Sequence, residues 1–349
     1  MNTQTDLSTS SRKTEHIRIC LNEDVQAQGI SIGLENYRFI HQALPEIDLA
    51  EVDLHQTLFG KPINSPIIIS SMTGGAEWSA RINRNLAEAA QYHGLAMGLG
   101  SQRAAIENPE LVYSYQVRRY APDIPLFANL GAVQLNYGYG PAQCRAAVEM
   151  IEADALILHL NVLQEAVQPS GNTNFKGLLG KIETVCRELA KDGIKVIAKE
   201  VGNGLSREVA QKLYEAGVSG LDVGGSGGTS WSQVESYRIK QPVERNAAEA
   251  FAGWGIPTAQ SVLWARLAAP EATVIGSGGL RSGLDIAKII ALGADVGGLA
   301  LPFLKAAEIS AEAVSATIEQ LVRELRIAMF CIGAVNLTDL QQTESLVRI

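Results

Sequence analysis

The sequence has little cysteine, few aromatic residues and no long apolar run. Its 349 residues include only four cysteines, Cys20, Cys144, Cys186 and Cys331, and none stands in a CxxC spacing. We therefore expect reduced thiols that fill space in the core, and neither disulfides nor a zinc site. No early apolar segment follows the start, and no apolar stretch reaches the roughly 20 residues of a membrane helix. These absences predict a cytoplasmic protein that does not enter a membrane.

Basic residues are not in excess either. The chain has 29 Lys and Arg against 37 Asp and Glu, a formal net charge of -8. This charge argues against a general nucleic-acid or anionic-membrane binder, although it allows a local basic pocket for a small anion. The composition is 46% hydrophobic and 19% charged, with 33 glycines that cluster after apolar runs. Such a composition is typical of a soluble globular enzyme.

Eight short apolar runs recur along the chain, and most are followed by a segment with helical periodicity. The runs cover residues 66–71, 95–100, 125–130, 155–160, 195–201, 219–224, 272–277 and 295–301. Helices are predicted over residues 78–92, 109–120, 141–152, 177–191 and 310–329, the last with Ser310 as its N-cap. This alternation predicts an α/β fold, a (β/α)8 TIM barrel with a C-terminal helix over residues 66–349. A doubly wound open sheet is the alternative.

Residues 1–65 are predicted to form an N-terminal tail and a capping hairpin. Residues 1–11 are polar and rich in Ser and Thr, so we expect them to be disordered. Short apolar bursts between residues 44 and 62 predict a small hairpin that plugs the non-catalytic end of the barrel. The stretch 226–255 is too long for an ordinary loop, and we expect it to overhang the catalytic end.

The most informative stretch is residues 155–165. An apolar strand changes there within a few residues to His159, Asn161, Gln164 and Glu165. Catalytic groups of parallel barrels lie at the carboxyl ends of the strands, so this order predicts side chains delivered to one site. A strand that runs into a solvated loop is the alternative for this stretch alone. The same change on other strands favours the site.

Two glycine-rich turns, residues 224–229 and 276–283, follow the sixth and seventh runs. Neighbouring turns of this kind that lead into helices, together with Arg281, predict a phosphate held by backbone amides. Residues 300–302 would close the other side of that phosphate. Neither turn has the GxGxxG spacing of a dinucleotide site after a first strand, so a nicotinamide is expected only as a visiting reductant.

Several basic residues need a negatively charged partner. Lys199 lies inside an apolar strand, where a flavin N1–C2 edge fits its ammonium group and a salt bridge is the alternative. Arg12, Lys13 and His16 would clamp an anionic ligand or merely solubilise the tail. Arg103, after the second run, could take a phosphate or form a surface ion pair.

With these residues assembled, the sequence resembles the type 2, FMN-dependent isopentenyl diphosphate isomerases over nearly its whole length. The most specific motifs are the Arg-Lys-x-x-His start at 12–16, the Ser-Met-Thr-Gly-Gly turn at 71–75, the His-Leu-Asn-x-Leu-Gln-Glu strand end at 159–165 and the Gly-Gly-Leu-Arg-Ser-Gly turn at 278–283. Val162 is a departure, because the family pattern usually has proline there.

The resemblance implies interconversion of isopentenyl and dimethylallyl diphosphates in isoprenoid biosynthesis. It implies reduced FMN as a non-redox acid–base cofactor, Mg2+, NADPH as external reductant, and a homo-oligomer, either tetramer or octamer. Gln164 would be the catalytic residue that touches the substrate, as proton relay or positioning group, and Glu165 would bind Mg2+. The other substrate-binding residues would be Arg12, Lys13, His16, Arg103, His159 and Asn161. FMN would be held by Ser71, Met72, Thr73, Ser101, Asn129, Lys199, Thr229, Gly279, Leu280, Arg281, Ala300 and Leu301.

Two other functions are compatible with a phosphate-binding barrel. An FMN enzyme that oxidises a 2-hydroxy acid shares the strand-five lysine and the late phosphate turns, but such enzymes carry a catalytic histidine near strand six or seven. Residues 224–229 contain no histidine. A flavin-free barrel that acts as ligand sensor or scaffold is the other alternative, and colourless protein that FMN cannot reconstitute would favour it.

Overall fold

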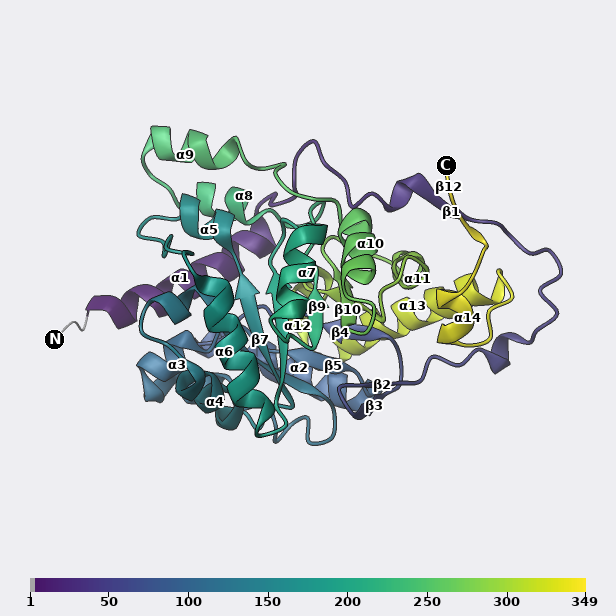
Figure 1. The fold of residues 1–349 in the computed structure, drawn as a ribbon, viewed down its shortest axis with the longest axis horizontal. Helices are drawn as coiled ribbons and strands as arrows, with labels where there is room; N and C mark the ends of the chain where they lie inside the picture. Colours follow the sequence, from purple (N-terminus) through teal and green to yellow (C-terminus); the bar gives the residue numbers. More distant parts are fainter. Residues whose placement is uncertain (1–3) are drawn as a thin grey trace.

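The computed structural model describes residues 4–349, with side chains from residue 11, and closes eight parallel strands into a barrel (Figure 1). Each strand pairs with the next along the chain, and the last pairs with the first. The predicted (β/α)8 barrel is confirmed, and the open sheet is wrong. The barrel strands are β4 (Ile67–Ile69), β5 (Ala96–Gly98), β6 (Leu126–Gly131), β7 (Ala155–Leu160), β8 (Lys195–Glu200), β9 (Gly220–Asp222), β10 (Thr273–Ser277) and β11 (Val296–Leu299).

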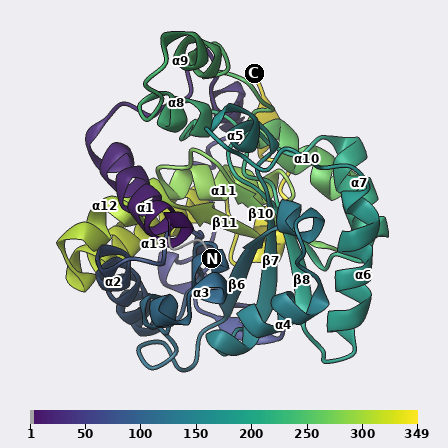
Figure 2. The same cartoon turned by 90° about the vertical axis from the view of Figure 1, so that its left-hand side faces the viewer.

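Helices surround the barrel and bury their apolar faces against it (Figure 2). The predictions over residues 78–92, 141–152 and 177–191 are each confirmed to within two residues. The outer helices are α2 (Glu77–His93), α3 (Arg103–Glu107), α4 (Pro141–Met150), α6 (Leu178–Ala190), α7 (Arg207–Glu215), α10 (Thr258–Ala268), α11 (Gly283–Ala291) and α12 (Leu301–Ile309). Short 3₁₀-helices are η1 (Leu34–Asn36), η2 (Leu49–Glu51), η3 (Pro109–Ser114) and η4 (Ala132–Asn136).

The C-terminal helix α13 (Ala311–Phe330) confirms the predicted helix over residues 310–329. The hydroxyl of Ser310 accepts a hydrogen bond from the amide of Ala313 and caps the helix, as predicted. A stripe of side chains at helical spacing packs inward: Val314, Ile318, Leu321, Leu325 and Met329. The chain then forms α14 (Leu337–Gln341) and β12 (Leu346–Arg348), which pairs with β1 (Tyr37–Phe39).

The predicted helix over residues 109–120 is wrong beyond Ser114. Only the 3₁₀-helix η3 forms there, and irregular turns follow it. Tyr115 and Val117 are both buried, and residues two apart cannot share one face of an α-helix. An α-helix packed along a single face would leave one of these two side chains exposed, whereas the irregular backbone buries both.

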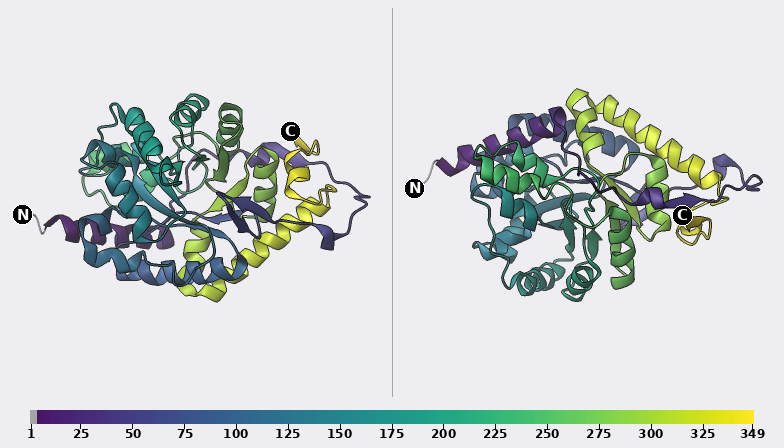
Figure 3. Two further views of the ribbon diagram at one scale, coloured as in Figure 1. Left: turned by 60° about the horizontal axis from the view of Figure 1, so that its bottom comes forward. Right: turned by 90° about the horizontal axis from the view of Figure 1, so that it is seen from above.

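Helix α1 (Gln4–Asn22) replaces the expected disordered segment, so that prediction is wrong for residues 4–11, while residues 1–3 lie outside the described residues. Ile17, Ile19 and Cys20 are buried and fix the second half of the helix to the barrel. Composition identified the polar first half but not this attachment. Figures 1 and 3 place α1 at the end of the molecule opposite to β1 and β12.

A hairpin plugs the amino-terminal end of the barrel, as predicted, but it is shorter than the stretch 44–62. Strands β2 (Gln56–Leu58) and β3 (Lys61–Ile63) are antiparallel. Leu58, Phe59 and Ile63 pack against inward side chains of the barrel strands, such as Phe127. The opposite, carboxyl end is therefore the open one.

Residues 226–255 form α8 (Trp231–Ser236) and α9 (Pro242–Glu249), and α5 (Val162–Val167) lies beside them. Figure 2 shows these helices and α1 around the carboxyl ends of the strands, which confirms that the long segment overhangs that end. Among residues 4–349, no helix combines the length and hydropathy needed to span a bilayer.

Two matching arginine–aspartate pairs tie neighbouring strands together at their amino ends. Arg118 Nη2 lies 2.9 Å from Asp154 Oδ2, and the same oxygen accepts the amide of the first residue of β6. Arg266 Nη2 lies 2.7 Å from Asp295 Oδ2, which accepts an amide of β10. Each arginine also donates to backbone carbonyls of the loop before the strand. These pairs satisfy loop carbonyls that would otherwise lack partners.

We expect Arg118→Met to lower the free energy of unfolding by about 3 kcal/mol, because it removes the donor of several loop carbonyls and one of the two cations paired with Asp154, the other being Lys61 at 2.7 Å. Urea unfolding measures this change. The control is Arg187→Met, because Arg187 is 61% exposed and lies 3.8 Å from Glu188; an exposed pair of this kind contributes less than about 1 kcal/mol. Equal losses in the two variants would contradict a structural role for Arg118.

Candidate active site

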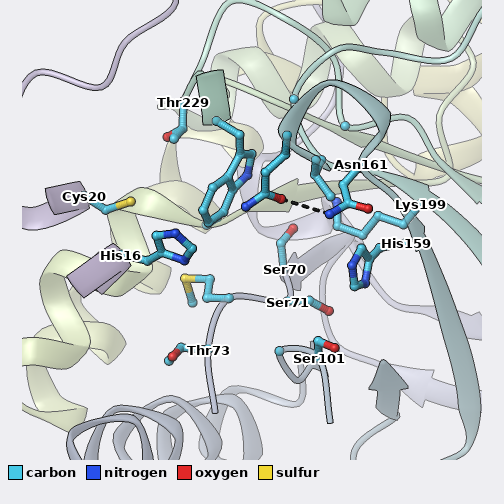
Figure 4. A pocket seen from close by; sticks show the side chains of 18 of the residues that line it. His16, Cys20, Ser70, Ser71, Thr73, Ser101, His159, Asn161, Lys199 and Thr229 are labelled. Carbon is cyan, nitrogen blue, oxygen red and sulfur yellow. Dashed lines mark hydrogen bonds between the residues drawn. The ribbon is translucent and has the colours of Figure 1, made fainter. Parts of the chain in front are cut away.

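A cavity at the carboxyl ends of the strands is lined by all twenty residues that the sequence assigned to ligands. They come from the ends of β4, β5, β6, β7, β8, β10 and β11, from α1 and α5, and from the segment before α8. The structure thus brings the predicted residues together, while their individual roles stay predictions. Figure 4 shows His16 and Cys20 on one side of the cavity and His159, Asn161 and Lys199 on the other.

Helix α5 presents a hydrogen-bonded cluster directly after β7. Asn161 Nδ2 donates to Gln164 Oε1 (3.1 Å) and Glu165 Oε1 (3.0 Å). The other oxygen of Glu165 accepts from Gln168 Nε2 (2.7 Å) and from the amide of Asn172 (2.5 Å). These hydrogen bonds hold the carboxylate of Glu165 in a fixed orientation. They also satisfy a carboxylate that is nearly buried, since only 7% of the residue is exposed.

Glu235 on α8 is a site residue that the sequence did not reveal. It is completely buried, and its Oε1 lies 3.1 Å from Gln164 Nε2 and 3.0 Å from His16 Nε2. Arg238 Nη1 donates to its other oxygen (2.5 Å). Burial alone would raise the pKa of Glu235, but His16, Gln164 and Arg238 outweigh it and lower the pKa to about 2. Glu235 is therefore an ionised carboxylate that joins α1, α5 and α8.

Lys13 on α1 is anchored by Tyr115, a second residue that the sequence did not single out. Its Nζ donates to the carbonyl of Ser101 (2.7 Å) and to Tyr115 Oη (2.5 Å), and Tyr115 itself donates to that carbonyl (2.7 Å). Burial and the neighbouring Arg12 lower the pKa of Lys13 to about 7. Arg12 also has a lowered pKa, mainly through burial. Helix α1 thus delivers two basic groups that no carboxylate fully compensates.

Arg103 and Arg281 also face the cavity. Arg103 Nε pairs with Glu107 (2.7 Å) with 31% of its side chain exposed, so the predicted alternative of an ion pair is confirmed, although the residue also lines the cavity. Arg281 Nη2 contacts Gln26 Oε1 (3.3 Å), and burial lowers the pKa of Arg281. Gln26 belongs to the segment after α1, which runs across the glycine-rich turns.

The glycine-rich turns 224–229 and 276–283 touch backbone to backbone. A Cβ atom at Gly278 would lie 2.2 Å from the carbonyl oxygen of Gly225, and one at Gly228 would lie 2.5 Å from the amide nitrogen of Gly279. Gly278 also has a φ of +108°, which side chains strongly disfavour. Only glycine allows the two turns to form this smooth cradle beside Arg281.

His159 and Lys199 stand side by side on neighbouring strands in the barrel register. His159 Nδ1 donates to Asn129 Oδ1 (2.8 Å), which leaves Nε2 as an acceptor. Burial, together with the charges of Lys199 and Lys13, lowers the pKa of His159 to about 4. Lys199 Nζ lies 3.0 Å from Asp222 Oδ2 on β9, so the predicted alternative of a salt bridge is confirmed. Lys199 lines the cavity as well, and its contact with a flavin stays a prediction.

Buried polar atoms in the cavity wall without a hydrogen-bond partner fit a polar ligand. Ser70 Oγ, Ser71 Oγ and Asn161 Oδ1 are such atoms in the described part of the chain. Buried polar groups are normally paired, so these atoms call for a ligand with both donors and acceptors. A flavin ring meets that need, and the glycine cradle with Arg281 suits its phosphate. These features therefore fit FMN.

Fold and site together define a (β/α)8 barrel with a phosphate cradle and a deep polar pocket at its carboxyl end, as in TIM-barrel flavoenzymes. The sequence model of the FMN-dependent dehydrogenase family matches residues 179–348. Among solved structures, mandelate oxidase shares the fold with a TM-score of 0.65 and 18% identity, covering 97% of this chain and 96% of that one. A flavocytochrome b2 variant has a TM-score of 0.67 at 15% identity, covering 99% and 92%.

Curated relatives are more similar in sequence. Isopentenyl-diphosphate delta-isomerase from Nostoc sp. is 52% identical over 99% of this chain and 98% of its own length. The enzymes of that name from Synechocystis sp. (55% identity, 96% and 95% coverage) and Rickettsia prowazekii (49%, 95% and 96%) are also similar. This chain belongs to the isopentenyl-diphosphate delta-isomerase family, in its FMN-dependent type.

We expect Arg12→Ala to raise the KM for a diphosphate substrate about tenfold, because a charge-assisted contact to phosphate contributes roughly 1.5–3 kcal/mol. Steady-state kinetics measure this effect. Arg18→Ala is the matched control, because Arg18 lies exposed on the same helix. An unaltered KM in Arg12→Ala would return this arginine to a solubilising role.

Stability should depend on pH through His159. Its pKa is about 4 in the folded protein against 6.5 in the unfolded chain, so only the unfolded chain gains a proton between these values. The free energy of unfolding therefore falls as the pH is lowered through this window. We expect apo wild type to lose about 1–2 kcal/mol more than His159→Asn between pH 7 and pH 5 in urea unfolding. The exposed His41→Asn should behave like wild type, and equal losses in all three proteins would contradict a neutral, partly buried His159.

Proposed function

We propose that this protein interconverts isopentenyl and dimethylallyl diphosphates with bound reduced FMN and Mg2+, by proton transfer and without net oxidation. One observation carries the proposal: two separate anion sites open into the same cavity. The glycine cradle with Arg281 is one, and the cationic group of Arg12, Lys13 and Arg103 is the other. A cofactor phosphate and a substrate diphosphate would use one each. The relatives, which are named for this activity, support the same assignment.

Arg12, Lys13 and Arg103 would hold the substrate diphosphate. The pKa of Lys13 is lowered to about 7 in the absence of an anion, so a diphosphate beside it would favour the charged ammonium again. His16 on the same helix would orient the ligand, because its ring packs edge-on against Trp231 with centroids 5.2 Å apart. Arg12, Lys13 and His16 come from α1, so a diphosphate that binds them would also hold α1 over the cavity.

Glu165 would bind Mg2+ through one carboxylate oxygen. Its Oε2 accepts two hydrogen bonds and its Oε1 only that of Asn161, so one lone pair of Oε1 is left for a ligand. No cluster of three or more His, Cys, Asp or Glu suited to a metal occurs in the described part of the chain. A single carboxylate suits Mg2+ that takes its other ligands from substrate phosphates and water.

FMN would lie with its phosphate in the glycine cradle and its ring against the remaining predicted residues, from Ser71 to Asn129 and Lys199. When reduced and bound, it supplies an electron-rich face beside the alkene and a proton held at N5. Lys199 would stabilise negative charge at the N1–C2 edge. His159, kept neutral by burial, would accept a hydrogen bond through Nε2 without adding a positive charge beside an electron-deficient reaction centre.

Gln164 is held at both ends of its amide. Its Oε1 accepts from Asn161, and its Nε2 donates to the ionised Glu235. An amide is too weak an acid to protonate an alkene by itself, so Gln164 would position the substrate or relay a proton toward Glu235. Glu235 would in either case fix the amide and provide negative charge near a carbocation-like centre.

We further propose NADPH as the external reductant, a cytoplasmic location and a homo-oligomer, either tetramer or octamer. The absence of a GxGxxG turn after the first strand supports a visiting reductant. Light scattering on purified protein tests the oligomer, and anaerobic reduction of bound FMN by NADPH tests the reductant.

An anaerobic assay of isopentenyl diphosphate conversion tests the main proposal, with FMN, Mg2+ and reductant each present or omitted. We expect conversion only when all three are present, and no consumption of reductant in proportion to product. Failure to convert despite bound, reducible FMN would contradict the isomerase. Oxidation of 2-hydroxy acids by the same protein would then identify the alternative, which the lack of a histidine in residues 224–229 disfavours.

We expect Gln164→Ala to retain FMN but to lower kcat about 100-fold or more, because positioned proton transfer contributes roughly 10²–10⁴ in rate. The absorbance of bound flavin measures FMN retention, and single-turnover kinetics measure the rate of the chemical step. Val162→Ala is the matched control, because Val162 is 56% exposed on the same helix. An unchanged kcat in Gln164→Ala would rule out both proposed roles.

A further inference from the structure

The partner of Lys199, Asp222, lies outside the cavity. Asp222 stands opposite Lys199 in the β8–β9 register, is 3% exposed and is absent from the cavity wall, whereas Lys199 contributes to that wall. The two groups approach to 3.0 Å between Nζ and Oδ2. Asp222 can therefore act on a ligand only through Lys199 or through its electric field.

We infer that Asp222 is a positioning residue that aims Lys199 at the flavin and offsets its charge, so that bound FMN has a lower reduction potential than Lys199 alone would give. This inference rests on the proposed function, because it takes FMN as the ligand of the cavity. It adds a role that neither the sequence motifs nor the cavity wall assign to Asp222.

The second oxygen of Asp222 ties the ion pair to the phosphate cradle. Oδ1 accepts a hydrogen bond from Ser277 Oγ at the end of β10. That hydroxyl accepts from the amide of Gly224 (3.1 Å), and the carbonyl of Ser277 accepts from the amide of Gly225 (2.8 Å). The turns that would hold the FMN phosphate thus also fix the carboxylate that holds Lys199. The same hydrogen-bonded network would therefore fix the positions of both the FMN phosphate and the N1–C2 edge of the flavin relative to the barrel.

The charges of the pair determine the direction of its effect. Lys199 and Asp222 together are neutral, with the ammonium end toward the cavity. The other carboxylate nearby, that of Glu200, accepts from the amides of residues 201–203, and Glu200 contacts Lys199 through its carbonyl oxygen (3.1 Å). Reduction places negative charge at the flavin edge, so an uncompensated Lys199 would favour reduction more than the intact pair does.

The test is the midpoint potential of bound FMN in wild type, Asp222→Asn, Lys199→Met and the double variant. We expect Asp222→Asn to shift the ratio of reduced to oxidised FMN about tenfold toward reduced, which is about 30 mV for a two-electron couple. Lys199→Met should shift it the other way. The double variant should lie between the two, near wild type, because it again carries no net charge. A wild-type potential in Asp222→Asn, or a double variant equal to Lys199→Met, would overturn the inference.

Two further variants separate charge from folding. Asp222→Glu keeps the charge and should keep the wild-type potential, whereas Asp192→Asn removes a surface carboxylate, 45% exposed, and should change nothing. If Asp222→Asn does not fold, the double variant still should, because removing both partners leaves no unpaired buried charge. A higher midpoint potential in the double variant than in Lys199→Met would then support the inference, and equal potentials in these two variants would overturn it.

These measurements need bound FMN but no turnover. Wild type that holds FMN and does not isomerise the substrate would contradict the proposed function and leave the test of Asp222 intact. Wild type that cannot bind FMN would overturn both.

Discussion

Closure of the parallel sheet into a barrel is the constraint on which the site depends. It brings eight strand ends to one mouth, and the β2–β3 hairpin fills the other end. Polar side chains at the ends of the strands, several of them buried, then face one another, and a buried charge is costly unless it is paired. The ligand pocket is the part of this mouth in which that pairing is incomplete.

The charged groups at the mouth of the barrel present basic side chains to the cavity, where they can bind anionic ligands. Lys199 is backed by Asp222, whereas Lys13 rests on a carbonyl and the hydroxyl of Tyr115. Arg238 pairs with both Glu15 and Glu235, and Glu235 also restrains Gln164. The basic groups without a carboxylate partner are thus concentrated on α1, where a diphosphate would bring its own negative charge, while the reacting end of the substrate would lie near the neutral His159 and Gln164 and the carboxylate of Glu235.

The sequence predicted the parts of this arrangement that depend on local pattern. Apolar runs predicted the eight strands, and the change to polar residues after the strand at 155–160 predicted that its end faces a site. The glycine-rich turns predicted a phosphate site, and the family resemblance supplied most of the other cavity residues. It did not reveal Glu235 or Asp222, because a carboxylate in a short helix or strand gives no local sign of burial or of its distant partner. The attachment of α1 was missed for a similar reason: its first half is polar, and its buried apolar contacts come from Ile17, Ile19 and Cys20. Tertiary pairing decided these cases.

In the proposed reaction, bound reduced FMN acts in proton transfer and is not consumed. The most direct test of this reaction is to reduce the enzyme-bound FMN once, remove all other reductant, and count the turnovers of isopentenyl diphosphate in D2O without oxygen. Many turnovers per flavin, deuterium in the dimethylallyl product and a flavin spectrum that stays reduced are the predicted result. At most one product per flavin, with the flavin oxidised afterwards, would contradict the account.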